Sequence, residues 1–514
     1  MASEQALTEI KKLGTCEPFN APPGANIIDS HFVLRRKHDA QGNISRYKAH
    51  LVAKGFKQQF GVDYTDTFAL TVRVSTLWVL LSIAGSLGDK VVVEQADAKN
   101  AYLNSWLHDN EVIYMYHPQH FDIFCSIPAE FANKPKKTIF LRLCQLLYGM
   151  KQEANYWYKE LKRILLLLGF RVLIADEAVF YKVEGMKFIV IAAATDDFTF
   201  IANSTKSVAL VKMQMSEHFE LIDLGPINWL LEVSVVHDIG NWTISLRQEA
   251  YIEQILICFG LDRARSAVTL MEPSADFTPD SPSVLPTLLT AAEKTTYREM
   301  IGSLMYLAMM TCPDISFVVS TLSQYLEAPR TTYLNAIHRI FHYLSGTKQL
   351  KLVLRGKVND VVRYSNADWA SHIHRHSISG FAFFIGQGVI SWSTKKQPII
   401  TLSSTESEYV TLTHVSKDII WLHKILKELS FLYPLFLSTT LHCDNQGAID
   451  LSKDSKFHAH TKHIDVHFHF ICQTVTQGHI SINYCPTDNM IADIFTKSLT
   501  YIKFQKFHML LNVV

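Results

Sequence analysis

An apolar stretch interrupted by a pair of aspartates constrains the fold of this chain more than any other feature. Residues 188–194 are all apolar, the run stops at Thr195-Asp196-Asp197, and it resumes at residues 198–201. This pattern predicts two buried strands that meet at a tight turn carrying two carboxylates. A solvated turn is the plain interpretation because Asp favours turns, but both flanks are more apolar than an ordinary exposed turn.

A third acid, Asp97, ends a separate apolar strand that begins near residues 91–93. Adjacent strand ends can converge, so Asp97, Asp196 and Asp197 are candidates for one cluster. Three carboxylates repel one another, and unless some take up protons, cations must balance them. Hard oxygen ligands select Mg²⁺, which also accepts phosphate oxygens as ligands. Two such ions roughly 3.5–4 Å apart would activate a 3′-hydroxyl and stabilise the leaving pyrophosphate, which is polymerase chemistry.

The composition indicates a folded protein whose contacts with acidic partners are local. The chain has 514 residues, of which 48% are apolar and 19% charged, and this excludes a mainly disordered chain. A length of this size predicts roughly three or four folding units. Forty-nine Lys and Arg against 48 Asp and Glu leave a net charge of +1. Any contact with nucleic acid must therefore come from local basic patches.

The cysteines and the N-terminus bear on cellular location. The eight cysteines are scattered and form no Cys-x-x-Cys pair, which argues against a zinc ribbon or a redox dithiol. Reduced thiols in an intracellular setting, cytoplasmic or nuclear, are the expectation. The N-terminus is polar, and no apolar run reaches about 18 residues, so neither a signal peptide nor a membrane span is expected.

A basic hairpin is predicted near the N-terminus. Two β-prone arms flank a turn at residues 39–43. From Arg35 to Lys57 the chain has seven Lys or Arg residues and one acid. Lys48 and Lys54 lie in this segment, where cations could hold the phosphates of a nucleotide or a template. A solvated basic face is the alternative interpretation.

Four segments resemble the reverse transcriptases of copia-type long-terminal-repeat retrotransposons. Their sequences are YKAHLVAKGF at residues 47–56, DYTDTF at 63–68, QADAKNAYL at 95–103 and LYGMKQ at 147–152. Together with later segments, the resemblance runs from about residue 14 to residue 500. It implies a fragment of a retrotransposon Pol polyprotein with an α/β (α+β) fold. That fold would be a right-hand polymerase with fingers, palm and thumb, followed by a ribonuclease H-like domain.

The resemblance also implies residue roles. The three aspartates would hold two Mg²⁺ ions. Tyr102 would be the aromatic gate beneath the incoming sugar, where its ring favours deoxynucleotides, and simple core packing is the alternative. Gly149 and Lys151 match the loop that packs near the incoming nucleotide. The implied partners are an RNA template, a DNA primer, an RNA–DNA hybrid and deoxynucleoside triphosphates.

A second set of acids lies in the C-terminal part of the chain. Residues 403–406 match a capping box, and the helix behind them has an apolar stripe that passes through Leu412 and leads back to Glu408. Asp444 ends an apolar strand, and Asp493 lies in the first turns of a helix. Acids at the ends of separate elements suit a two-metal nuclease. A first-turn Glu408 that reaches solvent is the alternative.

This part resembles the ribonuclease H domain of the same family. The resemblance implies four Mg²⁺-holding acids, of which Glu408, Asp444 and Asp493 are present and the first is replaced by Asn366. An amide brings no charge. Asp368 lies about 6.5 Å along the strand from position 366, which is too far for it to substitute. We therefore expect the fold to persist with weak or absent hydrolysis. The matching sequences are YSNADWA at residues 364–370, STESEY at 404–409, CDNQ at 443–446 and ADIFTK at 492–497.

The polymerase half departs from the family pattern at four places. His50 stands where an Arg normally meets the triphosphate, and a neutral imidazole cannot fork onto phosphate. Ala194-Thr195 replaces Tyr-Val, Glu-Ala-Asn at residues 153–155 replaces Ala-Pro-Arg, and Leu230-Leu231 replaces Leu-Gly. Metal ligands are kept while substrate-holding parts are altered. This combination fits an enzyme of reduced activity or a decayed element copy.

The leading functional prediction is template-directed synthesis of DNA from RNA with Mg²⁺. The alternative is a catalytically decayed remnant that still binds nucleic acid. A structural interaction protein fits least, because the predicted fingers are basic. No membrane contact is expected. The predicted parts are a lead-in at residues 1–13, the reverse transcriptase at 14–270, a helical connection at 271–355, the ribonuclease H-like domain at 356–500 and a tail at 501–514.

Overall fold

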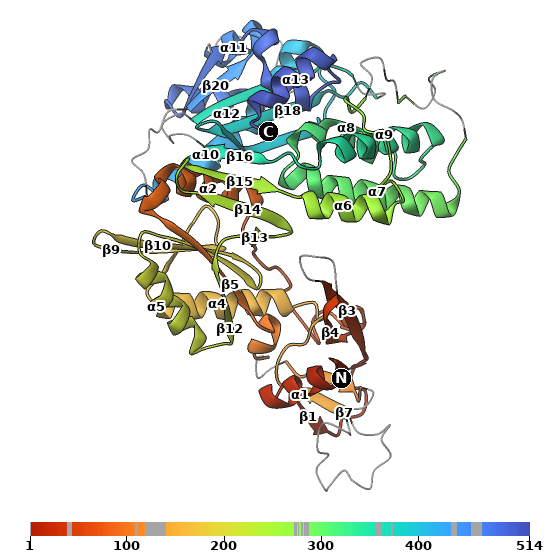
Figure 1. Ribbon diagram of the computed structural model, residues 1–514, viewed down its shortest axis with the longest axis vertical. Coiled ribbons are helices and arrows are strands. Elements are labelled where there is room, and N and C mark those ends of the chain that lie inside the picture. The colour runs from red at the N-terminus through yellow and green to blue at the C-terminus, as the bar shows by residue number, and fades with distance from the viewer. Residues whose placement is uncertain are drawn as a thin grey trace. The chain divides into compact units, whose positions relative to one another are not determined.

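The computed structural model is of mixed α/β type, which confirms the predicted α/β class (Figure 1). Backbone contacts divide the chain into two compact units. The first unit contains Met1–Val72, Glu94–Val172 and Glu177–Gly225, and the second contains Arg73–Val93, Leu173–Asp176 and Pro226–Val514. The structure describes residues 2–38, 44–107, 111–118, 121, 140–271, 275, 277–278, 281, 287–355, 361–371, 374–432, 439–453 and 465–514.

A small four-stranded sheet and one helix open the first unit. The strand order is β1-β7-β6-β2, with β1 antiparallel to β7 and β2 parallel to β6. Leu7 and Ile10 of the helix pack in one buried cluster with Ile28, Leu141 and Leu143, and their burial holds helix and sheet together. The elements are α1 (Ala2–Leu13), β1 (Cys16–Phe19), β2 (Ile27–Ile28), β6 (Tyr114–Tyr116) and β7 (Phe140–Leu143).

The predicted basic hairpin is present in the first unit. Its arms β3 (Ser30–His38) and β4 (Ile44–Ala53) pair antiparallel, with Ser30 opposite Ala53 at the open end. The predicted turn at residues 39–43 lies outside the described residues. A short 3₁₀ helix, η1 (Gly55–Lys57), follows directly after β4.

A six-stranded sheet with the order β12-β5-β11-β10-β9-β8 forms the centre of the first unit. The two strands predicted around the aspartate pair are β10 and β11, which pair antiparallel from Ile189 opposite Ala202 to Ala194 opposite Asp197. The strand predicted to carry Asp97 is β5, next to β11. The elements are β5 (Val92–Ala98), η3 (Ala101–Asn104), α4 (Glu153–Leu167), β8 (Arg171–Val172), β9 (Val179–Glu184), β10 (Lys187–Ala194), β11 (Asp197–Ala202), α5 (Thr205–Ser216) and β12 (Leu221–Pro226).

The second unit contains a buried helix, a four-stranded sheet and a helical layer. The buried helix is α2, and the sheet order is β13-β14-β15-β16. Leu231 and Glu232 join β13 to β14 with φ angles of 49° and 56°. Glycine adopts such angles freely, so the Leu-Leu departure leaves this turn strained. The elements are α2 (Val74–Leu87), η2 (Gly88–Lys90), β13 (Trp229–Leu230), β14 (Val233–Asp238), β15 (Thr243–Arg247), α6 (Glu249–Cys258), α7 (Ala291–Met310), η6 (Pro313–Ile315), α8 (Ser316–Ser323), α9 (Thr331–Thr347) and β16 (Leu352–Arg355).

A five-stranded mixed sheet with the order β19-β18-β17-β20-β21 ends the second unit. The first three strands are antiparallel, whereas β20 runs parallel to β17 and β21 parallel to β20. The long helix predicted from Ser403 is α10, and its apolar stripe is buried. The elements are β17 (Val361–Asp368), β18 (Ile378–Ile385), β19 (Gly388–Lys396), α10 (Ser404–Glu428), β20 (Thr439–Cys443), α11 (Gln446–Lys453), α12 (Asp465–Thr476), β21 (Ile480–Tyr484), η8 (Thr487–Asn489), η9 (Ile491–Phe495) and α13 (Tyr501–Leu510).

Two local predictions in this sheet region need correction. The Ser403 hydroxyl accepts from the backbone N–H of Glu406 at 3.2 Å, but the Glu406 carboxylate accepts from Leu402 N–H at 2.7 Å. The capping box is therefore only half formed, because the glutamate turns to a neighbouring donor. Asp493 lies in the 3₁₀ helix η9 and not in an α-helix.

The predicted domain boundaries stay a prediction. The contact-based division assigns Arg73–Val93 to the second unit, although this segment lies inside the predicted polymerase region of the sequence. Among the described residues, no helix combines the length and the apolar character needed to cross a lipid bilayer.

Candidate functional site

The aspartate pair occupies the tip of the β10–β11 hairpin, as predicted. Ala194 pairs with Asp197, and Thr195 takes a left-handed conformation with φ 63°. The indole N–H of Trp157 on α4 donates to the carbonyl oxygen of Thr195 at 2.7 Å. Asp196 is exposed and Asp197 is half-buried. The tight turn therefore presents both carboxylates at the edge of the sheet.

Asp97 lies at the end of β5, beside this hairpin tip. The backbone N–H of Ala98 donates to the carbonyl oxygen of Asp196 at 2.8 Å, which fixes the end of β5 against the turn. Burial raises the pKa of the Tyr148 hydroxyl, and the charges of Asp196 and Asp97 raise it further. Both carboxylates therefore act on one hydroxyl group. The structure brings the predicted acids to one edge of the sheet.

The donors at this edge are of the kind that Mg²⁺ takes. Asp97, Asp196 and Asp197 are half-buried or exposed, and carboxylate oxygens are hard ligands. Within the described ranges, no three His, Cys, Asp or Glu side chains lie close enough to hold one metal ion. A cation at this edge would therefore take part of its ligands from water or from phosphate oxygens of a substrate, as Mg²⁺ commonly does.

Tyr102 lies in η3, directly after β5, and packs beside this acidic edge. Its ring centroid is 5.2 Å from that of Tyr148, and the two planes meet at 70°. Burial raises the pKa of Tyr102 to about 12, with smaller contributions from Glu153 and Asp196. The ring centroid of His50 also lies close to that of Tyr148, at 4.5 Å. Tyr102 is thus placed beside the predicted metal ligands, and its role as a sugar gate stays a prediction.

The loop that carries Gly149 fits closely against the end of β4. Ala53 N–H donates to the carbonyl oxygen of Tyr148 at 2.7 Å. Gly149 has φ 87°, and a side chain on it would overlap the Ala53 carbonyl oxygen and the Val52 side chain. Only glycine permits this backbone approach, so the predicted nucleotide loop is held firmly on the basic hairpin.

The predicted phosphate-binding lysines have partners within the protein. The Lys151 ammonium lies 3.0 Å from the Tyr64 hydroxyl and 4.8 Å from the centre of its ring. The Lys54 ammonium lies 3.7 Å from Asp29 Oδ2, and Lys57 contacts the same carboxylate. The side chain of Lys48 lies outside the described residues. Phosphate binding by these lysines stays a prediction.

Glu153, at the start of α4, is a residue of this region to which the sequence assigned no role. One of its carboxylate oxygens, Oε2, is buried without a hydrogen-bond partner. Burial raises the pKa of Glu153 to about 7, while hydrogen bonds from the backbone at Gly149 and Met150 oppose part of the rise. The sequence marked this position only through the departure from Ala-Pro-Arg at residues 153–155. That departure did not reveal that the Glu153 carboxyl is buried.

The second set of acids converges at one end of the five-stranded sheet. The backbone N–H of Ala367 donates to Glu408 Oε1 at 2.7 Å, and the Asn366 amide donates to Asp493 Oδ1 at 2.5 Å. Burial raises the pKa of Glu408 well above its usual range, and the charges of Asp444 and Asp493 add to the rise. All four positions predicted from the sequence are therefore neighbours in the second unit.

Asp493 is completely buried and is surrounded by donors. Lys497 Nζ lies 2.9 Å from its Oδ1, and Lys503 Nζ on α13 lies 2.7 Å from its Oδ2. The Asn366 amide also donates to the Thr496 hydroxyl at 2.9 Å. The sequence did not predict the pairing of Lys503 with Asp493, because Lys503 lies ten residues further along the chain on another element.

This second donor set does not fit a pair of divalent cations. A carboxylate can only accept hydrogen bonds, so the Asn366 group that faces Asp493 is the NH₂ group and not the oxygen. Both oxygens of Asp493 already face ammonium groups. Asp444, at the end of β20, accepts from the Thr487 hydroxyl at 2.9 Å.

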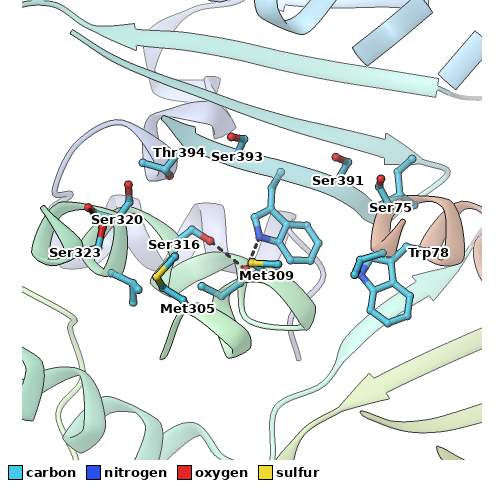
Figure 2. Close-up of a pocket in the computed structure, with 15 residues that line it drawn as sticks. Ser75, Trp78, Met305, Met309, Ser316, Ser320, Ser323, Ser391, Ser393 and Thr394 are labelled. Carbon is cyan, nitrogen blue, oxygen red and sulfur yellow. Dashed lines mark hydrogen bonds between the residues drawn. The ribbon is translucent and has the colours of Figure 1, made fainter. Parts of the chain in front are cut away.

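The second unit contains a cavity of about 430 Å³ (Figure 2). Trp78 of α2, Met305 of α7 and Trp392 of β19 line it together with a row of serine hydroxyls. The Trp392 indole N–H donates to the Ala308 carbonyl oxygen at 2.7 Å, and the Ser316 hydroxyl donates to the same oxygen. None of the described residues that line this cavity is charged.

Comparison with known protein families agrees with this arrangement. Residues 15–273 match the family described as "Reverse transcriptase (RNA-dependent DNA polymerase)". The match spans half of the chain, so the chain belongs to the reverse transcriptase family. The resemblance predicted from the sequence motifs is confirmed.

Related proteins of the same kind match almost the whole chain. The retrovirus-related Pol polyprotein from transposon TNT 1-94 of Nicotiana tabacum is 32% identical over 512 residues, which are 98% of this chain and 37% of that protein. The Pol polyprotein from transposon RE2 of Arabidopsis thaliana is 31% identical over 499 residues, covering 96% of this chain and 32% of that protein. The chain thus spans about a third of the length of these relatives.

One solved structure similar to part of the chain is LC11-RNase H1, isolated from compost. Its alignment covers 27% of this chain and 93% of that protein, with 13% identity and a TM-score of 0.22.

Proposed function

We propose that this chain carries the RNA-directed DNA polymerase activity of a retrotransposon Pol polyprotein. The observation that carries the proposal is the hydrogen bond from Ala98 N–H to Asp196, which sets Asp97 beside the β10–β11 tip. The six-stranded sheet would be the palm of a right-hand polymerase, and the β3–β4 hairpin would belong to its fingers.

Asp97, Asp196 and Asp197 would hold two Mg²⁺ ions. When bound, these ions lower the pKa of the primer 3′-hydroxyl and stabilise charge on the leaving pyrophosphate. The contribution of the chain is to position the three carboxylates, because β5 and the hairpin tip are locked together by backbone hydrogen bonding. The exposed position of Asp196 leaves room for the substrate's own phosphate oxygens.

The residues around the acidic edge would select and hold the nucleotide. The half-buried ring of Tyr102 would stand beneath the sugar, where a 2′-hydroxyl would collide with it. Gly149 lets the backbone approach closely, and the cations of Lys151, Lys54 and Lys48 would meet phosphates of the nucleotide or template. The proposed partners are an RNA template, a DNA primer and deoxynucleoside triphosphates.

The test is extension of a DNA primer on an RNA template with Mg²⁺ present or absent. Wild-type protein should extend the primer, and Asp196→Asn should reduce extension at least about a hundredfold, because a metal ligand loses its charge. Asp262→Asn, on an exposed loop of the second unit, is the matched control and should extend normally. Equal extension by Asp196→Asn and wild type would refute the proposed site.

A second candidate function is a nucleic-acid-binding remnant with both folds intact. The observation that favours it is the pairing of Asp493 with two lysines and the Asn366 amide, which leaves the ribonuclease H-like acids without an open metal position. Weak or absent hydrolysis of an RNA–DNA hybrid follows for that part of the chain. Salt-sensitive binding of a hybrid without any primer extension would favour this candidate over the polymerase.

A further inference from the structure

We propose that Lys497 and Lys503 replace divalent cations in the second acidic set, and that the set is an internal ion-pair cluster. The cluster consists of Asn366, Glu408, Asp493 and these two lysines. This cluster holds the C-terminal helix α13 against the five-stranded sheet. The polymerase chemistry of the first unit plays no part in this cluster.

The first argument is the occupation of Asp493. A carboxylate offers about four lone-pair sites. Asn366 and Lys497 approach Oδ1 at 2.5 and 2.9 Å, and Lys503 approaches Oδ2 at 2.7 Å. The Asp493 side chain has 0% exposure, so bulk solvent does not reach its carboxylate. A cation could bind Asp493 only by displacing one of these donors from a buried carboxylate.

The second argument is charge balance. Glu408, Asp444, Asp493 and the nearby Asp368 carry at most four negative charges, and the two lysines bring two positive charges into contact with Asp493. At most two net negative charges are left. Two divalent cations bring four positive charges, so their mutual repulsion would be opposed by too few carboxylates. An aspartate at position 366 would have added the missing acid.

The third argument is the direction in which the Asn366 amide points. Its NH₂ group donates to Asp493 and to the Thr496 hydroxyl. To offer its oxygen to a cation, the amide would have to turn over and break both hydrogen bonds. The orientation is therefore the one that stabilises the ion pair and not the one that binds metal.

The consequence for the fold lies in the C-terminal segment. Lys503 belongs to α13, whose Phe504 and Phe507 are buried. Beyond the helix, the backbone N–H of Val514 donates to the carbonyl oxygen of Lys351 at 2.9 Å. The side-chain amide of Asn512 donates to the carbonyl oxygen of Val353 at 2.7 Å. The segment is thus tied at its start by an ion pair and at its end by backbone pairing with β16. Asp493 would then be a structural residue.

The first test maps iron-binding sites on the full-length protein. Bound Fe²⁺ with ascorbate and peroxide generates hydroxyl radicals that cut the backbone nearby, and fragment lengths report the sites. Wild type should be cut near residues 97 and 196 and not near 366 and 493. The double variant Asn366→Asp with Lys503→Met should gain cuts near 366 and 493.

The outcomes of the mapping are decisive in each case. Cuts near 366 and 493 in wild type would overturn the ion-pair proposal, and so would their absence in the correctly folded double variant. Cuts near 97 and 196 report on the polymerase site separately, so failure of one proposal is distinguishable from failure of the other.

The second test is thermal unfolding, which stays informative if the double variant does not fold. Lys503→Met should lower the melting temperature by about 5 °C, because one oxygen of a buried carboxylate loses its ammonium partner. Lys506→Met is the matched control, since Lys506 lies on the same helix, faces the same Phe507 ring as Lys503, and otherwise donates to the Asp488 carbonyl and the Asn489 amide oxygen. Equal melting temperatures for the two variants would also overturn the proposal.

Discussion

At the scale of single residues, burial distinguishes Glu153 from the nearby aspartates Asp97, Asp196 and Asp197. Asp97, Asp196 and Asp197 remain half-buried or exposed, whereas Glu153 has a carboxylate oxygen buried without a hydrogen-bond partner. A buried carboxyl favours its neutral form. The region therefore combines acids suited to cations with one carboxyl that changes charge near neutral pH.

Replacing Glu153 by Gln should flatten the pH dependence of stability. Burial raises the pKa of Glu153 from 4.5 to about 7, so the folded chain holds a proton that the unfolded chain has lost in this window. Wild-type stability is full below about pH 4.5 and falls as the pH rises through about 7, by roughly 1–2 kcal/mol after allowance for partial exposure. Urea unfolding at several pH values should show this slope for wild type and not for Glu153→Gln.

The control for this prediction is Glu217→Gln, a change of the same chemistry at an exposed position of the first unit. It should keep the wild-type slope. A slope in Glu153→Gln as steep as that of wild type would contradict the assignment of the titrating group.

At the scale of elements, close backbone packing determines where the loop that carries Gly149 lies. The carbonyl oxygen of Tyr148 accepts from Ala53 N–H. A side chain on Gly55 would overlap the Gly149 carbonyl oxygen, and one on Gly149 would overlap Ala53 and Val52. β4 and the loop thus behave as one rigid piece, on which Lys151 and Tyr148 are carried. The same kind of backbone bond joins β5 to the β10–β11 tip.

Gly149→Ala should destabilise the first unit by about 2–4 kcal/mol. A positive φ costs about 1 kcal/mol for alanine, and the overlap with Ala53 and Val52 adds the rest. Gly185→Ala is the matched control, because Gly185 has φ 61° and open space around its Cα. Urea unfolding should show only the conformational cost for the control, and equal losses for both variants would show that the loop can yield.

At the scale of the whole chain, an almost neutral protein concentrates its positive charge locally. The net charge is +1, yet the segment from Arg35 to Lys57 has seven basic residues and one acid. Affinity for a phosphate backbone depends on such a patch, because binding releases counterions from the nucleic acid. Asp29 holds Lys54 and Lys57 at the base of this hairpin and so orders part of the patch.

Lys54→Ala should weaken binding of an RNA–DNA hybrid and reduce its salt dependence. One lost phosphate contact lowers the slope of log affinity against log salt concentration by about 1. Fluorescence anisotropy at several salt concentrations measures this slope. Lys206→Ala, at an exposed position on α5, should leave it unchanged. An unchanged slope for Lys54→Ala would remove Lys54 from the contact surface.

Much of the fold was predictable because its signals are local. The run from residue 188 to 201 shows two strands and their turn, and the stripe through Leu412 shows a long helix, since burial imposes these periods on the sequence. The half-formed capping box and the 3₁₀ helix around Asp493 were not predictable. In the capping box the Leu402 N–H competes for the Glu406 carboxylate, and local spacing does not encode that competition.

The sequence by itself determined the reverse transcriptase family, the acids at the ends of strands, and the loss of one acid at Asn366. These features are written in short segments and in the types of their side chains. Only the tertiary structure decided that Lys503 pairs with Asp493, that Lys54 pairs with Asp29, and that Glu153 is enclosed. The physical reason is that partners and burial arise when distant segments meet, and no local period of the chain records which segments those are.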